Sequence, residues 1–226
     1  MSQSARFESN TAFINYPKQA VFGRTLPKNK IYEHSGANTR LKDLFVEQVV
    51  WQYKLAPETI NLPARLGVPE LQIFSIQLKA SELNLDVLRC IDGAVQFPII
   101  FELSFDGRTK VIAAYKRPNE SDASRWVLSD YFATAWLPSD CERAAMPLAL
   151  DLGGLYEQLL HSLISTPARL QESLADLVAR VELVAAKERE VEKIASRLAK
   201  EKQFNRKVEI NAKLRMLKIE LEELKH

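Results

Sequence analysis

Residues 95–117 read VQFPIIFELSFDGRTKVIAAYKR and contain the strongest hairpin signal in the chain. Two largely apolar runs, 95–105 and 109–117, flank the dipeptide Asp106-Gly107. Asp-Gly between two strand-like runs is typical of a tight β-hairpin, because both residues tolerate the positive φ angles of a type I′ turn. The stretch therefore predicts two antiparallel strands that meet at Asp106-Gly107.

Further strands are expected on both sides of this hairpin. Residues 124–136 (SRWVLSDYFATAW) are aromatic and alternate in polarity, which predicts a third antiparallel strand. Residues 70–79 (ELQIFSIQLK) are largely apolar on both faces, as an internal strand is. Residues 59–62 (TINL) predict one more short strand.

Apolar residues at helical spacing predict helices at 40–54, 81–91 and 150–164. We expect the second to begin with Ser81 as its N-cap and to end at Gly93 in the left-handed conformation. Three consecutive strands after this helix favour a mostly antiparallel sheet. The expected fold class is α+β, with a mostly antiparallel sheet flanked by helices and a long, coiled-coil-like C-terminal helical arm.

The 226 residues are expected to form an irregular N-terminal arm (1–37), an α+β core domain (38–165) and a C-terminal helical arm (166–226). The net charge of +2 argues against a strongly polycationic nucleic-acid binder, although it permits a local basic patch. Cys90 and Cys141 are too few for a disulfide framework. No stretch is typical of a signal peptide or a membrane span, so we expect a cytoplasmic protein.

The C-terminal arm carries an apolar stripe with the 4-3-4-3 spacing of a coiled coil. Its helix is expected to begin with Ser165 or Thr166 as N-cap and Pro167 as first residue. A helix of roughly 50 residues would be about 75 Å long, more than the core domain can cover. The stripe is therefore expected to contact a partner protein, a second copy or itself through Leu170, Leu174, Leu177, Val181 and Val184.

The stripe lapses within residues 201–211 (EKQFNRKVEIN). This segment contains no glycine or proline and several good helix formers, which favours one continuous helix through Asn205. Asn205 and Asn211 are then expected to make hydrogen bonds that set the register of a packed face. The alternative is a helical hairpin that reverses between Lys200 and Arg206.

No residue pattern identifies a reaction. His34, His161 and His226 do not lie at metal-ligand spacing from one another or from a cysteine, and a glycine-rich phosphate loop is absent. We therefore expect no metal and no organic cofactor. The sequence favours a non-catalytic protein over an enzyme and leaves enzymatic activity open.

A metal-dependent nuclease is the catalytic alternative, built on Glu70, Glu102 and Lys116. Such enzymes hold a divalent cation between carboxylates on adjacent strands, close to a lysine. Neither glutamate is followed by a lysine two positions later. Cross-strand ion pairs on an ordinary polar strand face are the simpler interpretation.

Two basic pairs are candidates for contacts with nucleic-acid phosphates. Lys116-Arg117 follows Tyr115 in a predicted strand, where aromatic side chains can stack on bases. Arg206-Lys207 lies in the arm. Core packing of the aromatic residues and a solvated helix face are the competing interpretations.

Six stretches carry a resemblance that spans nearly the whole chain: LPKNKIY (26–32), WQYKLAPETINL (51–62), ELQIFSIQLK (70–79), VLRCIDGAVQFPIIFEL (87–103), VIAAYK (111–116) and QFNRKVEINAKL (203–214). Together they resemble the bacterial and archaeal family called domain of unknown function 4391. None of these motifs has a known chemical role, so the resemblance implies no site residue.

Genes of that family often lie beside Swi/Snf-type helicases and site-specific DNA methyltransferases, in restriction-like or antiphage clusters. The resemblance therefore implies a non-catalytic accessory subunit that works with a helicase and a methyltransferase on DNA. The alternatives from the residues are a nuclease-like DNA-processing subunit and a stand-alone nucleic-acid-binding protein. Self-association is the alternative to those protein partners.

Overall fold

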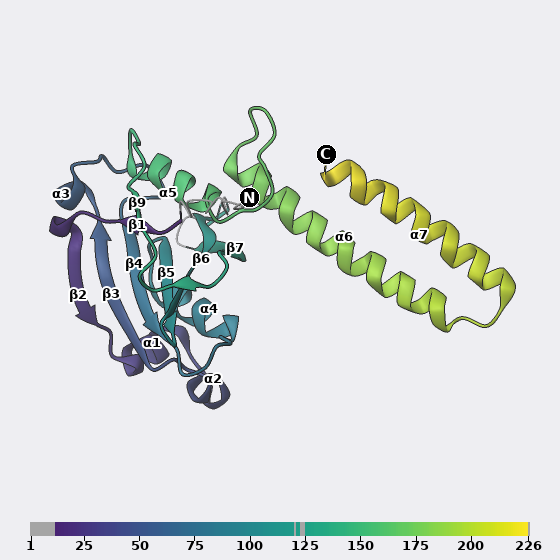
Figure 1. Cartoon of the computed structure of the whole chain (residues 1–226), viewed down its shortest axis with the longest axis horizontal. Coiled ribbons are helices and arrows are strands. Elements are labelled where there is room, and N and C mark those ends of the chain that lie inside the picture. Colours follow the sequence, from purple (N-terminus) through teal and green to yellow (C-terminus); the bar gives the residue numbers. More distant parts are fainter. Residues whose placement is uncertain (1–11, 120, 123–124, 226) are drawn as a thin grey trace, which may run out of the picture. The chain divides into compact units, whose positions relative to one another are not determined.

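The structure is a computed structural model that describes residues 12–119, 121–122 and 125–225. Its internal contacts divide the chain into two compact units, with the division between Ser165 and Thr166. The first unit is a sheet with helices, and the second is a helical hairpin (Figure 1).

The main sheet has the strand order β2-β3-β4-β5-β6-β7, with β8 beside β6. Its strands are β2 (Val21–Thr25), β3 (Gln48–Leu55), β4 (Leu71–Gln77), β5 (Ile99–Phe105), β6 (Arg108–Pro118), β7 (Trp126–Ala133) and β8 (Leu137–Pro138). Strands β4 and β5 are parallel, and the other pairs of this sheet are antiparallel. A separate parallel pair is formed by β1 (Ile14–Asn15) and β9 (Ala144–Ala145).

The hairpin at Asp106-Gly107 is confirmed. Strands β5 and β6 pair antiparallel from Phe105 opposite Arg108 up to Phe101 opposite Ile112. Both turn residues have positive φ, 45° at Asp106 and 69° at Gly107, as a type I′ turn requires.

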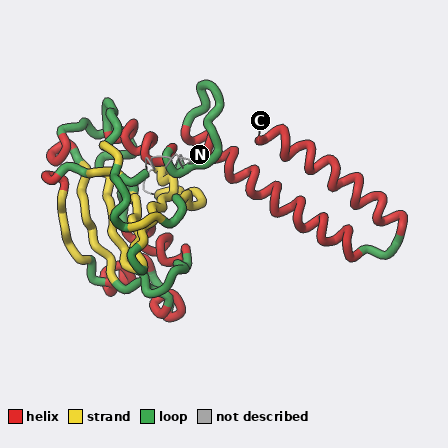
Figure 2. Tube along the Cα trace, viewed as in Figure 1, coloured by secondary structure: helices red, strands yellow, loops and turns green. Residues whose placement is uncertain are grey.

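The helices are α1 (Lys28–Ser35), α2 (Thr39–Asp43), α3 (Pro57–Ile60), α4 (Leu85–Ala94), α5 (Leu152–His161), α6 (Leu174–Lys200) and α7 (Phe204–Lys225), and a 3-10 helix spans Lys18–Ala20. Helix α4 connects the parallel strands β4 and β5, because a parallel pair needs a crossover. The α+β class with a mostly antiparallel sheet and a long helical C-terminus is confirmed (Figure 2).

The sheet is covered on both faces. On one face, Phe74, Phe101 and Ile112 pack in a common core with residues of α1 and α4. On the other face, the Tyr156 ring of α5 lies 6.3 Å from the Tyr115 ring of β6. The Tyr156 hydroxyl donates to the Ala114 carbonyl at 2.8 Å and accepts the backbone N–H of Lys116 at 2.9 Å, which fixes α5 on β6.

Several local predictions are wrong. The expected helix at 40–54 is only the short α2, and Gln48–Leu55 form β3 between β2 and β4. Residues 49–51 and 53 are β-branched or aromatic, and pairing with two strands outweighs their helical spacing. The expected strand at 59–62 overlaps α3 instead, where the Thr59 hydroxyl accepts the N–H of Ala56 at 2.9 Å.

The limits of the helix expected at 81–91 are shifted. Asn84 replaces Ser81 as its N-cap and accepts the N–H of Asp86 at 2.8 Å, while Gly93 lies inside the helix. The N-terminal segment also differs from the expected irregular arm, because β2 joins the main sheet as an edge strand. Residues 1–11 of that segment lie outside the described residues.

The continuous C-terminal helix is wrong, and the alternative hairpin is correct. Helix α6 ends at Lys200, residues 201–203 form the turn, and α7 runs back beside α6 (Figures 1 and 2). Folding back buries the two apolar stripes against each other, and each buried Leu or Ile contributes roughly 1.5–3 kcal/mol. The helix also begins at Leu174 rather than at Pro167, because Ser173 is its N-cap and accepts the N–H of Asp176 at 3.2 Å.

Candidate interaction arm

The arm, residues 166–225, is an antiparallel pair of helices with its own apolar core. Ile194 of α6 and Ile210, Leu214 and Leu217 of α7 are buried together, and Val191, Ala195 and Leu198 pack around them. Ion pairs connect the flanks of the two helices: Lys187–Glu220, Glu190–Lys213 at 3.4 Å and Glu188–Lys225 at 2.8 Å. The arm therefore has the construction of a two-stranded antiparallel coiled coil.

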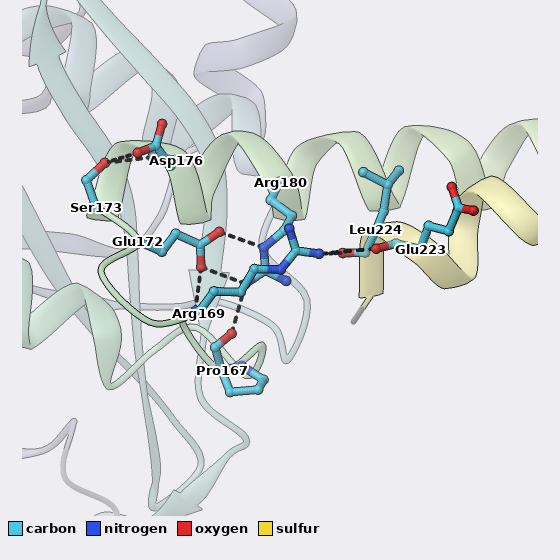
Figure 3. Close-up of polar contacts among 8 residues, drawn as sticks. All are labelled: Pro167, Arg169, Glu172, Ser173, Asp176, Arg180, Glu223 and Leu224. Carbon is cyan, nitrogen blue, oxygen red and sulfur yellow. Dashed lines mark hydrogen bonds and ion pairs between the residues drawn. The ribbon is translucent and has the colours of Figure 1, made fainter.

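A polar clasp closes the base of the arm (Figure 3). The Arg180 guanidinium donates to both carboxylate oxygens of Glu172, at 2.7 and 2.8 Å, and to the Pro167 carbonyl at 2.8 Å. The bond from Arg180 and a second from the Arg169 N–H lower the pKa of Glu172 to about 2. Arg169 also donates to the carbonyls of Glu223 and Leu224 at the end of α7, at 3.2 and 3.1 Å. The clasp joins the loop before α6 to the last turn of α7.

The turn at the other end of the arm depends on Glu201. Its carboxylate accepts the N–H groups of Lys202 at 2.8 Å and Gln203 at 3.0 Å. These two bonds lower the pKa of Glu201, and the nearby Arg206 and Arg197 add to the effect. A glutamate side chain thus provides the turn chemistry that the sequence lacks in the form of glycine or proline.

A second apolar stripe of α7 faces away from α6. Phe204, Val208, Met216 and Ile219 are 77%, 54%, 59% and 54% exposed. With the exposed Ala212 they follow helical spacing on one face. At 100° per residue, this face lies roughly opposite the buried stripe of Ile210, Leu214, Leu217 and Leu221.

The predicted partner-interface residues divide between surface and interior. Leu170 is exposed in the loop before α6, whereas Leu174 and Leu177 are buried and Val181 and Val184 are half-buried. Asn205 is exposed at the start of α7, and Asn211 is half-buried. No hydrogen bond of either asparagine side chain is found among the described residues, and their register-setting role stays a prediction.

Lys116 is an interior group of the first unit. It is 2% exposed, and its ammonium donates to the carbonyls of Asp92 at 2.6 Å and Val95 at 2.5 Å, at the C-terminus of α4. The Asp92 carboxylate lies 3.7 Å from Lys116 Nζ and accepts the Tyr131 hydroxyl at 2.5 Å. Burial lowers the pKa of Lys116 and raises that of Asp92 to about 6. Lys116 caps a helix and does not face solvent, where a phosphate would bind.

Arg117 lies on the opposite face of the sheet from Lys116, as neighbouring strand residues do. It is half-buried and lines a cleft of about 190 Å³ between β6, α5 and residues 65–68. In this cleft Arg65 pairs with Glu157 at 3.1 Å. The cleft is smaller than the roughly 300–1,000 Å³ of typical ligand pockets.

The structure keeps Glu70 and Glu102 apart. Glu102 of β5 pairs with Ser75 of β4, five residues beyond Glu70 and hence roughly 16 Å along the strand. Glu70 accepts the Gln72 amide at 2.6 Å and pairs with Lys54 at 3.3 Å. Glu102 binds both terminal nitrogens of Arg143 at 2.8 Å. Each glutamate therefore has its own cation, and Lys116 pairs with neither.

The described residues contain no group of three or more His, Cys, Asp or Glu arranged to hold a metal ion. Within the same part of the chain, no helix has the length and apolar character to cross a membrane.

A family model described as a domain of unknown function, DUF4391, matches residues 14–221. The match includes both units and most of the arm. No curated protein and no solved structure gives a significant match.

Proposed function

Since this chain belongs to the DUF4391 family, we propose that it is a non-catalytic accessory subunit of a DNA restriction-like or antiphage defence assembly. Its arm would dock on a protein partner of that assembly. The expected partners are a Swi/Snf-type helicase and a DNA methyltransferase, which are the subunits that act on DNA. We also place the protein in the cytoplasm, where Cys90 and Cys141 stay free thiols.

One observation carries the proposal: the outer face of α7 is an apolar stripe that no other described residue of the arm covers. Single exposed apolar residues are ordinary, but five aligned positions on one helix face form a docking surface. Proteins use this arrangement to bind an apolar helix face or groove of a partner.

The charges around the stripe specify the partner's chemistry. Residues 204–215 contain four basic residues and one acidic residue, and three of the four, Arg206, Lys207 and Arg215, lie outside the ion pairs of the described arm, whereas Lys213 pairs with Glu190. Residues 216–225 contain two basic and three acidic residues. The docking element is therefore a helix of the partner with an apolar face and acidic residues opposite the first half of α7. Charge complementarity of this kind sets orientation and partner choice.

The nuclease-like alternative has less support. Glu70 and Glu102 lie roughly 16 Å apart along the strands and each pairs with a different cation. Two carboxylates that hold one divalent cation lie within a few ångströms of it. Nothing in the geometry of these residues favours metal-dependent chemistry.

The test is co-expression of the tagged full chain with the helicase and methyltransferase encoded beside its gene. We expect at least one of them to co-purify in a fixed ratio and to be lost with Val208→Glu/Ile219→Glu. Leu148→Glu/Leu150→Glu, at two exposed leucines of the first unit, is the matched control and should retain the partner. Co-purification that is equal for all three chains would refute the docking face, and a dimer of the chain alone would identify a second copy as the occupant.

A further inference from the structure

The tip of the arm, residues 193–207, concentrates positive charge. It contains six basic residues, Lys193, Arg197, Lys200, Lys202, Arg206 and Lys207, against one acidic residue, Glu201. The rest of residues 166–226 contains eight basic and ten acidic residues. The charge of the arm is therefore segregated, with a basic tip and a slightly acidic shaft.

The six tip cations are available to a ligand. All six are exposed, and none pairs with an acid elsewhere in the described chain. Shaft cations, in contrast, bridge the two helices, as in Lys187–Glu220 and Lys213–Glu190. Glu201 is engaged with the N–H groups of the turn.

Their placement extends the charge over both helices. Lys193, Arg197 and Lys200 share one face of α6 at i, i+4 and i+7. With Ser196 and Glu201 they line a shallow depression at the end of that helix. Arg206 and Lys207 continue the charge onto the start of α7.

Helix electrostatics explain only part of this patch. Cations at the C-terminus of a helix stabilise it, which accounts for Arg197 and Lys200. Arg206 and Lys207 lie in the first turn of α7, next to the positive end of the helix dipole, and that turn contains no acid. Basic residues at this place disfavour the isolated helix and suit an anion bound there.

We propose that this tip binds the phosphate backbone of duplex DNA. Duplex DNA carries one negative charge per roughly 1.7 Å of its helix axis. The tip, with six cations within fifteen residues, presents a comparably dense positive charge. Lys193 and Lys200 are about 10 Å apart along the helix, enough for contacts with successive phosphates of one strand.

The width of the tip determines how it binds. Two helices side by side are about 20 Å across, wider than the roughly 12 Å major groove. The tip therefore lies across the backbone and does not read bases, so it binds without sequence preference. The tip shares Arg206 and Lys207 with the first half of the proposed docking helix, and its DNA contact can be tested on the purified chain alone, without the protein partner.

The test measures anisotropy of a labelled 25-base-pair duplex titrated with the full chain between 50 and 200 mM salt. Arg197→Gln/Lys200→Gln/Arg206→Gln removes three tip cations and keeps good helix formers. Arg189→Gln/Arg215→Gln/Lys218→Gln removes three exposed shaft cations, none of them in an ion pair within the described chain, and is the matched control.

We expect the tip variant to weaken binding at least about 30-fold at 50 mM salt and to reduce the slope of log K against log salt by about 3. The shaft variant should stay within about twofold, and two unrelated DNA sequences should bind equally. Lys193→Arg/Lys200→Arg/Lys202→Arg, which retains the charges, should bind like wild type. If the triple tip variant loses helicity, the double variant Arg206→Gln/Lys207→Gln replaces it. The slope of log K against log salt should then fall by about 2.

Equal losses in tip and shaft variants would overturn the proposal, because binding would then follow net charge alone. An unchanged isotherm for the tip variant would overturn it as well. Displacement of the DNA by polyglutamate at equal charge concentration, as effective as by unlabelled duplex, would identify an acidic protein surface as the ligand and also overturn it.

Discussion

Arg180 of α6 holds Glu172, eight residues earlier, through two parallel hydrogen bonds of 2.7 and 2.8 Å. The same guanidinium binds the Pro167 carbonyl, so one side chain fixes the whole loop that leads into the arm. A planar guanidinium suits this paired geometry, which a lysine cannot reproduce.

The pKa of Glu172 gives the clasp a pH dependence. Because Arg180 lowers the pKa of Glu172 from 4.5 to about 2, its stabilisation of the arm is complete above pH 4.5 and is lost as the pH falls towards 2. We expect Glu172→Gln to abolish this dependence and to leave the arm less stable at pH 7. Hydrogen exchange of the α6 amides between pH 2 and 5, corrected for intrinsic exchange rates, measures this pH dependence of the arm's stability. Identical pH profiles for wild type and Glu172→Gln would contradict the role of the clasp.

Lys116 is expected to be a stability residue of the first unit. Replacing it with Met leaves the buried Asp92 carboxylate without its cation and the backbone carbonyls of Asp92 and Val95 without the Lys116 ammonium as donor. Breaking a buried pair in this way costs about 3–5 kcal/mol. Urea unfolding measures the loss, and Lys116→Met/Asp92→Asn should lose less than the two single variants combined. A loss below about 1 kcal/mol for Lys116→Met would show that Lys116 is not a structural cap.

The two faces of α7 are expected to differ in their response to alanine. Leu217→Ala removes a side chain that is 5% exposed in the hairpin core and should destabilise the arm by about 2–3 kcal/mol. Ile219→Ala, on the outer stripe, should change stability by less than about 0.5 kcal/mol. Hydrogen exchange of the α7 amides resolves the arm from the first unit. Equal effects of the two substitutions would contradict the hairpin.

Divalent cations are expected not to bind the carboxylates of the sheet. Glu70 and Glu102 lie far apart and each already pairs with Lys54 or Arg143. Calorimetric titration with Mg²⁺ or Mn²⁺ should therefore give no heat beyond dilution. Stoichiometric binding that Glu102→Gln removes would restore the nuclease alternative.

The strands of the hairpin at Asp106-Gly107 were predictable because their signals are local. Turn chemistry and the largely apolar, strand-like runs on both sides favour the same structure there. Residues 48–55 were not predictable in this way, since helical spacing and β-branched side chains compete within the same residues. Only pairing with β2 and β4 decides between them, and that contact is remote in sequence.

The turn of the arm, like residues 48–55, is not predictable from local sequence signals. Residues 201–203 carry no conventional turn residue, and the Glu201 carboxylate takes over that role. Of the basic tip, the sequence singles out only the adjacent pair Arg206-Lys207, and the reversal of the chain at residues 201–203 is what brings Arg197 and Arg206 near the same Glu201 carboxylate. Lys116 shows a related limit: its charge favours the surface, while its partners Asp92 and Val95 lie more than twenty residues earlier.

The most direct test of the docking role is a binding isotherm of the purified full chain with the purified partner subunit that co-purifies with it. We expect Val208→Glu/Ile219→Glu to weaken the affinity at least about 100-fold, or about 2.7 kcal/mol, because two charges would be buried in an apolar interface. Leu148→Glu/Leu150→Glu should bind like wild type. Superimposable isotherms for the wild type and the α7 variant would contradict the central claim that the outer face of α7 docks this protein on its partner.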